Sequence, residues 1–216
     1  MPLDPPVLDL RRWSIKNQIR LRFDDLEAFL LLVEMSLTHE RASVEADARL
    51  THSFHPEELG ELEVERYQDE VRRLAEDFPQ TLRASALSMV QAAFEANLLA
   101  IGRYHAATKK KAFDEAIWFQ KRGRIWGTKR FLENECGMRG CTSYWPKIND
   151  YSNVRNAIMH GDGAITSTLK DPESTRAAAK RLQHVEIRGD TIVLDSQAAL
   201  DFTHAAKFLC FDLLRS

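Results

Sequence analysis

The longest apolar pattern in the chain, from residue 79 to about residue 107, is the feature that most restricts the fold. Apolar residues recur there every three or four positions, which is the spacing of one side of an α-helix. They form two adjacent stripes: Leu82, Ala86, Met89, Ala93, Ala96 and Ala100 in the first, and Leu87, Val90, Phe94, Leu98 and Ile101 in the second. A helix with two apolar stripes must contact two or more neighbours. The pattern therefore predicts the central helix of a bundle.

Other elements are predicted on both sides of this segment. Helical spacing, with its start and stop signals, predicts helices at residues 15–48, 57–77, 113–121, 124–136, 146–161, 172–182 and 196–214. Pro56 and Pro79 are expected to open their helices. Residues 184–195 alternate on both sides of Gly189 and Asp190, which predicts a β-hairpin. We expect one all-α domain over residues 1–216, with a small β-hairpin near the C-terminus and a flexible arm at residues 1–12.

The composition is typical of a soluble globular protein, with 44% hydrophobic and 29% charged residues. No apolar run approaches the length expected of a membrane span, and the N-terminal M-P-L-D-P-P lacks the basic and apolar regions of a signal peptide. The three cysteines are an odd number, and Cys136 and Cys141 lack the spacing of paired metal ligands. We therefore expect a reduced, cytoplasmic protein.

The formal net charge of −2 hides two segments of opposite charge. Residues 24–77 contain sixteen acidic residues against five arginines and no lysine, a net charge of −11. Residues 103–130 contain nine basic residues against two acidic ones, a net charge of +7. The basic segment could follow a phosphate backbone. Equally, the two segments could be solvated faces that attract each other, either within the bundle or between subunits.

A polar line runs along the predicted helix at residues 146–161. Asn149, Asn153, Asn156 and His160 follow one another at steps of four, three and four residues. Asparagine is a poor helix former, so three of them above a histidine cost helix stability unless that face is used. Arg155 places a fixed positive charge beside the line. The alternative is that the asparagines face water and the histidine only interacts with the negative end of the helix dipole.

The segment V-R-N-A-I-M-H-G-D-G, which contains Arg155, Asn156 and His160, resembles the signature of the HEPN superfamily (higher eukaryotes and prokaryotes nucleotide-binding). The upstream segment F-P-Q-T-L-R-A-S-A-L-S-M-V-Q-A-A-F-E-A-N-L is similar to the helix in which these proteins often carry a glutamate, here Glu95. The resemblance covers about residues 78–163. It implies a HEPN-like helical bundle and a metal-independent endoribonuclease, such as a toxin or a phage-defence effector. It also implies a homodimer with paired motifs at a shared cleft.

On this basis we predict Arg155, Asn156 and His160 as catalytic residues, with Glu95 and Asn153 in supporting positions. RNA can be cleaved without a metal when its own 2′-OH attacks the adjacent phosphorus. Histidine, whose pKa is about 6.5, suits removal of the hydroxyl proton, and arginine can hold two phosphate oxygens at once. Residues five apart on a helix point about 140° away from each other, so a second copy is expected to complete the site. Glu95 could instead be an acid on a solvent-facing strip.

Basic residues lie beside aromatic ones in the segment before the polar line, and we predict that they bind RNA. These residues are Lys121, Arg122, Arg124 and Lys129. The neighbouring aromatic side chains could stack on bases or belong to the core, as large aromatics usually do; they are Trp118, Phe119, Trp126 and Phe131. The predicted partners are RNA, a second copy of the chain and an antitoxin or defence-system protein, with no membrane.

No cofactor or metal is expected. The sequence has no phosphate-binding glycine loop, and His39, His52 and His55 lack the H-E-x-x-H spacing of a zinc site. No serine stands in the glycine-flanked elbow of an acyl-transfer enzyme. The rival to the nuclease is a non-catalytic HEPN-like module that binds a nucleotide, an RNA or a protein partner. The lack of an overall basic charge favours that rival.

Overall fold

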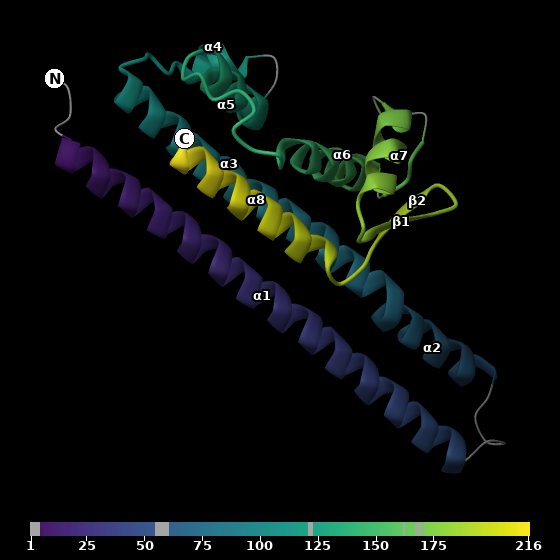
Figure 1. Ribbon diagram of the computed structural model, residues 1–216. Helices are drawn as coiled ribbons and strands as arrows, with labels where there is room; N and C mark the ends of the chain where they lie inside the picture. The colour runs from purple at the N-terminus through teal and green to yellow at the C-terminus, as the bar shows by residue number, and fades with distance from the viewer. Residues whose placement is uncertain (1–4, 55–60, 121–122, 162, 167–168, 170) are drawn as a thin grey trace.

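In the computed structural model the chain is mostly helical, with one antiparallel two-stranded hairpin near the C-terminus, as expected (Figure 1). The structure describes residues 5–54, 61–120, 123–161, 163–166, 169 and 171–216. In chain order the elements are α1 (Pro5–Phe54), α2 (Glu61–Arg72), η1 (Arg73–Asp77), α3 (Phe78–Lys109), α4 (Glu115–Phe119), α5 (Gly123–Asn134), α6 (Trp145–Gly161), α7 (Pro172–Arg181), β1 (Val185–Arg188), β2 (Thr191–Leu194) and α8 (Ala198–Arg215).

The helix α3 is the centre of the bundle, as its apolar pattern predicts. It packs against α1, α5, α6 and α8. The second predicted stripe, Leu87, Val90, Phe94, Leu98 and Ile101, is fully buried. The first stripe is buried only in part, because Met89 and Ala96 are exposed. The central helix therefore keeps one face open to solvent.

The predicted flexible arm at residues 1–12 is wrong for the described residues, because α1 begins at Pro5. Pro5 and Pro6 stand in the first turn of the helix, where a missing N–H removes no hydrogen bond. The helix also continues beyond its predicted end at residue 48, to Phe54. Its core-facing side buries Ile15, Ile19, Phe23, Leu26 and Leu30, whereas Val33 and Leu37, which continue the same helical spacing, are half-buried.

The helix α3 begins at Phe78 and has Pro79 in its first turn, within one residue of the predicted start. The sequence did not predict that α2, η1 and α3 follow one another without a break. The element η1 is a π-helical turn, in which the N–H of Phe78 donates to the carbonyl oxygen of Arg73 five residues earlier. Proline lacks an N–H and its ring clashes with the preceding turn of a regular α-helix. The π turn shifts the hydrogen bonding by one residue and so admits Pro79. Residues 55–60, including the predicted start at Pro56, lie outside the described part.

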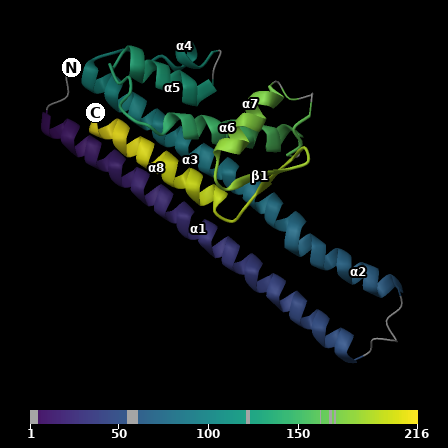
Figure 2. The same cartoon turned by 45° about the vertical axis from the view of Figure 1, so that its right-hand side comes forward.

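The last helix, α8, packs against both α1 and α3 and completes the core (Figures 1 and 2). Its inward-facing residues are buried, among them Leu200, Phe202, Ala206, Leu209 and Leu213. The polar side of the helix binds the outer helix, since Lys207 Nζ lies 2.6 Å from Asp24 Oδ1 and His204 Nε2 lies 2.9 Å from Glu27 Oε1. The N- and C-terminal helices therefore hold each other through both apolar and charged contacts.

The hairpin is attached to the central helix by a pair of reciprocal hydrogen bonds. The Gln80 side chain donates to the Leu194 carbonyl oxygen at 2.8 Å and accepts from the Leu194 N–H at 2.9 Å. The strands pair Val185 with Leu194 and Arg188 with Thr191. Gly189 in the turn has a φ of 61°, which the predicted two-residue connection requires.

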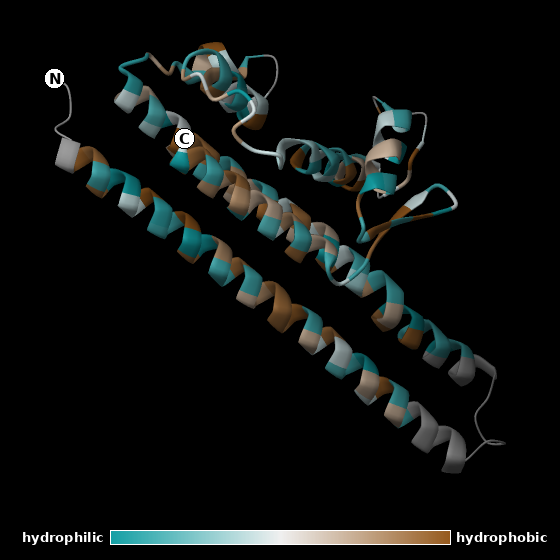
Figure 3. Ribbon diagram, in the orientation of Figure 1, coloured by the Kyte–Doolittle hydropathy of each residue, from teal (hydrophilic) through white to brown (hydrophobic). Residues whose placement is uncertain are grey.

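One helical stretch, Gln68–Lys109, is long and apolar enough to cross a membrane by length and composition alone. The expectation that no stretch reaches that threshold is therefore too strong. The core helix of a soluble protein passes the same test, and Leu87 and Phe94 of α3 are fully buried within the bundle. Figure 3 shows hydrophobic residues along α3 and α8, the two helices with the most extensive mutual packing.

Candidate functional site

The helix α6, Trp145–Gly161, carries the predicted polar line and is fixed by its opposite side. Ile148, Tyr151 and Val154 are fully buried, as their spacing predicts. The Tyr151 hydroxyl donates to Asp201 Oδ2 of α8 at 2.7 Å, and burial raises the pKa of this phenol. Lys147 Nζ binds the other oxygen of Asp201, also at 2.7 Å. These contacts leave the line of asparagines free to face away from the core.

The helix α7 is held against α6 by an ion pair that the sequence analysis did not predict. The buried Asp150 carboxylate accepts two hydrogen bonds from Arg181, at 2.9 Å from Nε and 2.6 Å from the terminal nitrogen. The hydrogen bonds from this arginine to the carboxylate raise the pKa of the Arg181 guanidinium. Such bidentate pairing fixes orientation as well as distance. It therefore determines which surface of α7 faces α6.

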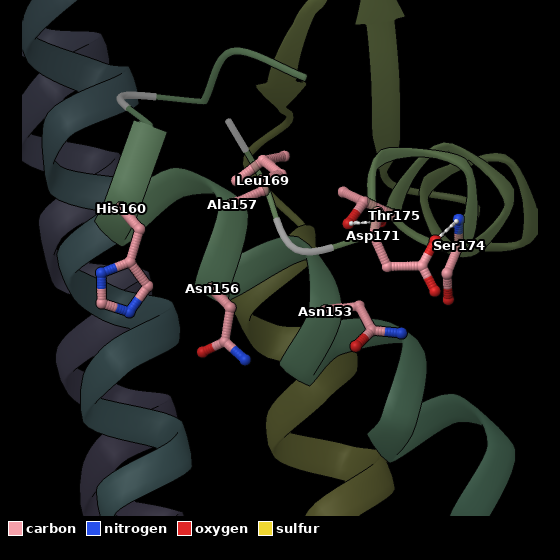
Figure 4. Close-up of a pocket in the computed structure, with 8 residues that line it drawn as sticks. All are labelled: Asn153, Asn156, Ala157, His160, Leu169, Asp171, Ser174 and Thr175. Atoms are coloured by element: carbon pink, nitrogen blue, oxygen red, sulfur yellow. Dashed lines mark hydrogen bonds between the residues drawn. The ribbon is translucent and has the colours of Figure 1, made fainter. Parts of the chain in front are cut away.

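A cleft of about 650 Å³ opens between these two helices. Figure 4 shows Asn153, Asn156 and His160 of α6 together with Asp171, Ser174 and Thr175 at the start of α7. The eight lining residues are Asn153, Asn156, Ala157, His160, Leu169, Asp171, Ser174 and Thr175. Three of the four residues in the predicted polar line thus share one cavity. Asn149, the first of that line, is half-buried and is not among the lining residues.

The α7 wall of the cleft begins with a helix cap. The Asp171 side chain accepts from the Ser174 N–H at 3.0 Å, as the predicted cap requires, and the Thr175 hydroxyl donates to the Asp171 carbonyl oxygen at 3.0 Å. These bonds order the polar groups with which the start of α7 lines the cleft. The end of α6 differs from the prediction, because the left-handed residue is Gly163, with a φ of 81°, and Gly161 is still helical.

Arg155 lies beside the cleft but does not line it. Its Nε donates to the Ser88 hydroxyl of α3 at 3.3 Å, and one terminal nitrogen donates to Asn156 Oδ1 at 3.2 Å. Asn156 therefore joins the arginine on one side to the cleft on the other. His160, one helical turn beyond Asn156, is exposed. Asn156 and His160 of the predicted catalytic trio thus share the cleft, whereas the Arg155 guanidinium is turned toward α3.

Glu95 lies in a different cleft, of about 410 Å³, and is not placed beside His160. It accepts a hydrogen bond from Gln91 at 3.3 Å, one turn earlier on α3. Arg22, Arg103 and Arg124 line the same cleft. The structure therefore joins the glutamate to one predicted RNA-binding residue, Arg124, and separates it from the polar cleft of α6. Neither Arg155 nor His160 takes part in its hydrogen bonding among the described residues.

Of the other three predicted RNA-binding residues, the structure describes one, Lys129. Lys121 and Arg122 lie outside the described residues. The ammonium group of Lys129 lies over the rings of Trp126 and Trp145, at 5.4 Å and 5.1 Å from their centroids. Such cation–π contacts occupy this lysine within its own subunit.

The aromatic residues named beside the basic ones pack against other aromatic rings, and one of them belongs to the buried core. Phe131 is fully buried and contacts Trp118 with ring centroids 5.6 Å apart. Trp126 is packed against Trp145 at 6.0 Å. Core packing is therefore what the structure shows for Phe131, whereas Trp118, Phe119 and Trp126 keep part of their surface exposed.

Within the described residues no group of three histidine, cysteine or acidic side chains has the arrangement of a metal site. Of the three histidines weighed for such a role, His39 is exposed on α1, whereas the side chains of His52 and His55 are not described. Cys136, Cys141 and Cys210 are free thiols, and burial raises their pKa values. Their raised pKa values argue against reactive thiolates.

The chain was compared with known protein families, curated proteins and solved structures, and none of the three comparisons gave a match.

Proposed function

We propose that this protein is a metal-independent endoribonuclease of the HEPN type, which cleaves RNA by attack of the substrate's own 2′-OH. The observation that carries the proposal is the cleft in which His160 and Asn156 stand one helical turn apart, with Arg155 hydrogen-bonded to that asparagine. A proton-transfer group, an amide and a permanent cation are the groups that such a reaction needs.

The reaction assigns one task to each side chain. Neutral His160 removes the 2′-OH proton, the 2′ oxygen bonds to phosphorus, and the bond from phosphorus to the 5′ oxygen breaks. Arg155 stabilises the negative charge that develops on the non-bridging oxygens, for which it must exchange its bond to Ser88 for one to phosphate. Asn156 orients the phosphate or the arginine. The products are a 2′,3′-cyclic phosphate and a 5′-hydroxyl end.

The leaving 5′ oxygen must also receive a proton, and one histidine cannot donate and accept at the same moment. A second copy of the chain, with its own His160, would supply the protonated imidazole. The exposure of His160 on the outer side of α6 supports such a two-copy site. We further propose that the enzyme works in the cytoplasm as a toxin or phage-defence effector, held in check by an antitoxin or another defence-system protein.

One observation favours a second candidate, a non-catalytic module that binds a nucleotide, an RNA or a protein partner in the same cleft. Arg155 already has two hydrogen-bond partners, Ser88 and Asn156, and its side chain is not part of the cleft wall. An arginine that keeps those bonds would position Asn156 without touching a phosphate. The cleft would then recognise a ligand through amide and hydroxyl groups only.

The two candidates are separated by incubating the purified protein with single-stranded RNA in excess EDTA. The nuclease predicts cleavage in the chelator, with 2′,3′-cyclic phosphate ends, and no cleavage of the same sequence with 2′-O-methyl groups. Intact RNA, together with saturable binding that His160→Ala weakens, would select the non-catalytic module. Cleavage that needs added Mg²⁺ would contradict the proposed chemistry.

A further inference from the structure

The long helix α1 carries a second apolar stripe on the side away from the core. Its members are Leu10, Leu21, Ala28, Leu32 and Met35, with Trp13 and Leu31 at the edge. At about 100° per residue they fall opposite the buried stripe that contains Phe23 and Leu26. We call this set the outer stripe. Within the described residues nothing covers it, and Leu32 and Met35 are 62% and 69% exposed.

The spacing of the outer stripe is that of a helix–helix contact. Leu21, Ala28 and Met35 are seven residues apart, the repeat with which two helices pack side by side. The small Ala28 stands at the middle of the three, where it allows two backbones to approach closely. Asp24, which lies beside this line, is held by Lys207 of α8 at 2.6 Å, so its charge is directed toward the bundle. Large exposed apolar sets of this kind mark interaction surfaces.

The charges of α1 change sign near residue 23, within the length of the outer stripe and five residues before Ala28. The first part contains five basic residues, Arg11, Arg12, Lys16, Arg20 and Arg22, whereas residues 24–47 contain seven acidic residues against Arg41 alone. The rest of the molecule extends this division. In Figure 1 the basic segment at the end of α3 and in α4 and α5 lies near the start of α1, and the acidic α2 lies near its end.

We propose that the outer stripe binds the outer stripe of a second copy of this chain in antiparallel orientation, with the two-fold axis near Ala28. Leu21 of each copy then lies level with Met35 of the other, since each is seven residues from Ala28. The basic first part of each α1 lies alongside the acidic second part of its counterpart. This inference rests on α1 alone and does not depend on the proposed function.

The charge distribution of α1 favours the antiparallel orientation, and it favours a second copy of the chain as the partner. Parallel pairing would set the five basic residues of each copy against the same five of the other, which is unfavourable. A membrane surface is a poor alternative, because the acidic half of α1 would be repelled by anionic lipid headgroups. A second copy would cover the apolar outer stripe and would also bring the basic block of each α1 beside the acidic block of the other. Within one chain these blocks adjoin at residues 22–24 of a single long helix, so they cannot be brought side by side (Figures 1 and 2). Asp24 and Glu34 are already paired, with Lys207 of α8 and Arg83 of α3.

The mass of the full-length protein in solution tests this inference. We expect Leu32→Glu combined with Met35→Glu to halve the mass found by light scattering at tens of micromolar, with an unchanged circular dichroism spectrum. Ile117→Glu is a matched control, since Ile117 on α4 is also 69% exposed but lies outside the stripe. A monomeric wild type, or a mass that the double substitution leaves unchanged, would overturn the proposal.

Cysteine crosslinking tests the orientation and separates this contact from a dimer formed around α6. Leu21→Cys mixed with Met35→Cys should form a disulfide between copies, and Leu21→Cys alone should not. In the antiparallel pair the two Leu21 positions are about 21 Å apart along the helix, and a disulfide needs Cα atoms within about 7 Å. Wild type under the same oxidant controls for the native cysteines. Self-crosslinking of Leu21→Cys, or no crosslinking in the mixture, would contradict the antiparallel contact.

Discussion

At the scale of single residues, the candidate site depends on the bond between Arg155 and Asn156. The asparagine lines the cleft and the arginine does not, so the 3.2 Å bond between them connects the permanent charge to the cavity. The sequence placed both residues on the correct helix surface, because their spacing determines the angle between them. It could not predict that the guanidinium also binds Ser88, since this contact joins residues 67 apart.

Substitutions of Arg155 and Asn156 should distinguish the effect of losing a positive charge from the effect of losing a group that only orients its neighbours. Arg155→Ala should lower the rate of RNA cleavage by about 10²–10³-fold, the loss expected when one charge-stabilising donor is removed. Asn156→Ala should lower it less, because an amide only orients its neighbours. Single-turnover rates in EDTA measure both, with Asn149→Ala as the control outside the cleft. Equal and small effects of all three substitutions would remove Arg155 from the reaction.

A buried histidine gives the fold a defined response to pH. His105 lies in the core with Nε2 2.8 Å from the Leu213 carbonyl oxygen, and burial lowers its pKa from the ordinary value near 6.5. The unfolded chain therefore binds a proton more readily than the folded one, and stability falls as the pH drops below about 6.5. We expect the thermal midpoint to fall between pH 7.5 and 5, and His105→Gln to reduce that fall. An identical slope in both proteins would contradict this.

At the scale of elements, the helices and the hairpin that have a clear residue spacing or a local start or turn signal could be predicted from the sequence. The central helix, the helix that begins at Pro172 and the hairpin turn at Gly189 were all predicted, because each depends on neighbouring residues. The π turn before Pro79 and the helical start at Pro5 were missed, since a proline signals a helix start and also tolerates a distorted or terminal turn.

The position of α7, which forms the second wall of the cleft, could not be predicted from the sequence. The helix α7 was predicted, but its position against α6 depends on the ion pair between Asp150 and Arg181. These residues are 31 apart and stand in no recognisable motif. The lining residues Ser174 and Thr175 were therefore not candidates until the two helices were seen side by side.

The contact of α4 with α5 provides a stability test at this scale. Gly127 has no room for a side chain: an added Cβ would lie 2.5 Å from the Trp118 carbonyl oxygen and 2.6 Å from Phe119 Cδ1. Gly127→Ala should therefore destabilise the fold by about 1–3 kcal/mol, as overpacking does. Gly161→Ala is the control, because among the described residues its added Cβ would meet Leu169 alone, at an ordinary 3.7 Å. Denaturant unfolding that finds both variants equal to wild type would contradict this packing.

At the scale of the whole molecule, the two charged segments lie at opposite ends of an elongated bundle (Figure 1). Segments so far apart do not attract each other strongly within one chain, which argues against that one alternative for the charge pattern. The basic end remains available to a phosphate backbone or to a second copy. The cleft with Arg22, Arg103 and Arg124 lies toward that end, along the same central helix that carries Ser88.

Removal of one charge from this cleft should weaken RNA binding without changing the chemical step. Arg124→Ala should raise the dissociation constant for a single-stranded RNA and reduce the salt dependence of binding by about one unit of slope. Arg66→Ala removes the same charge from α2 at the acidic end and should change neither. Titrations at several salt concentrations provide the comparison. Equal salt slopes for Arg124→Ala and wild type would place the RNA elsewhere.

The most direct test of the proposed activity is the single-turnover cleavage rate of His160→Ala in EDTA. Loss of the proton-transfer group should lower the rate by about 10²–10⁴-fold relative to wild type. His39→Ala removes an exposed histidine from α1 and should cleave at the wild-type rate. A folded His160→Ala protein that cleaves as fast as wild type would contradict the assignment of this site as the centre of an RNA-cleaving enzyme.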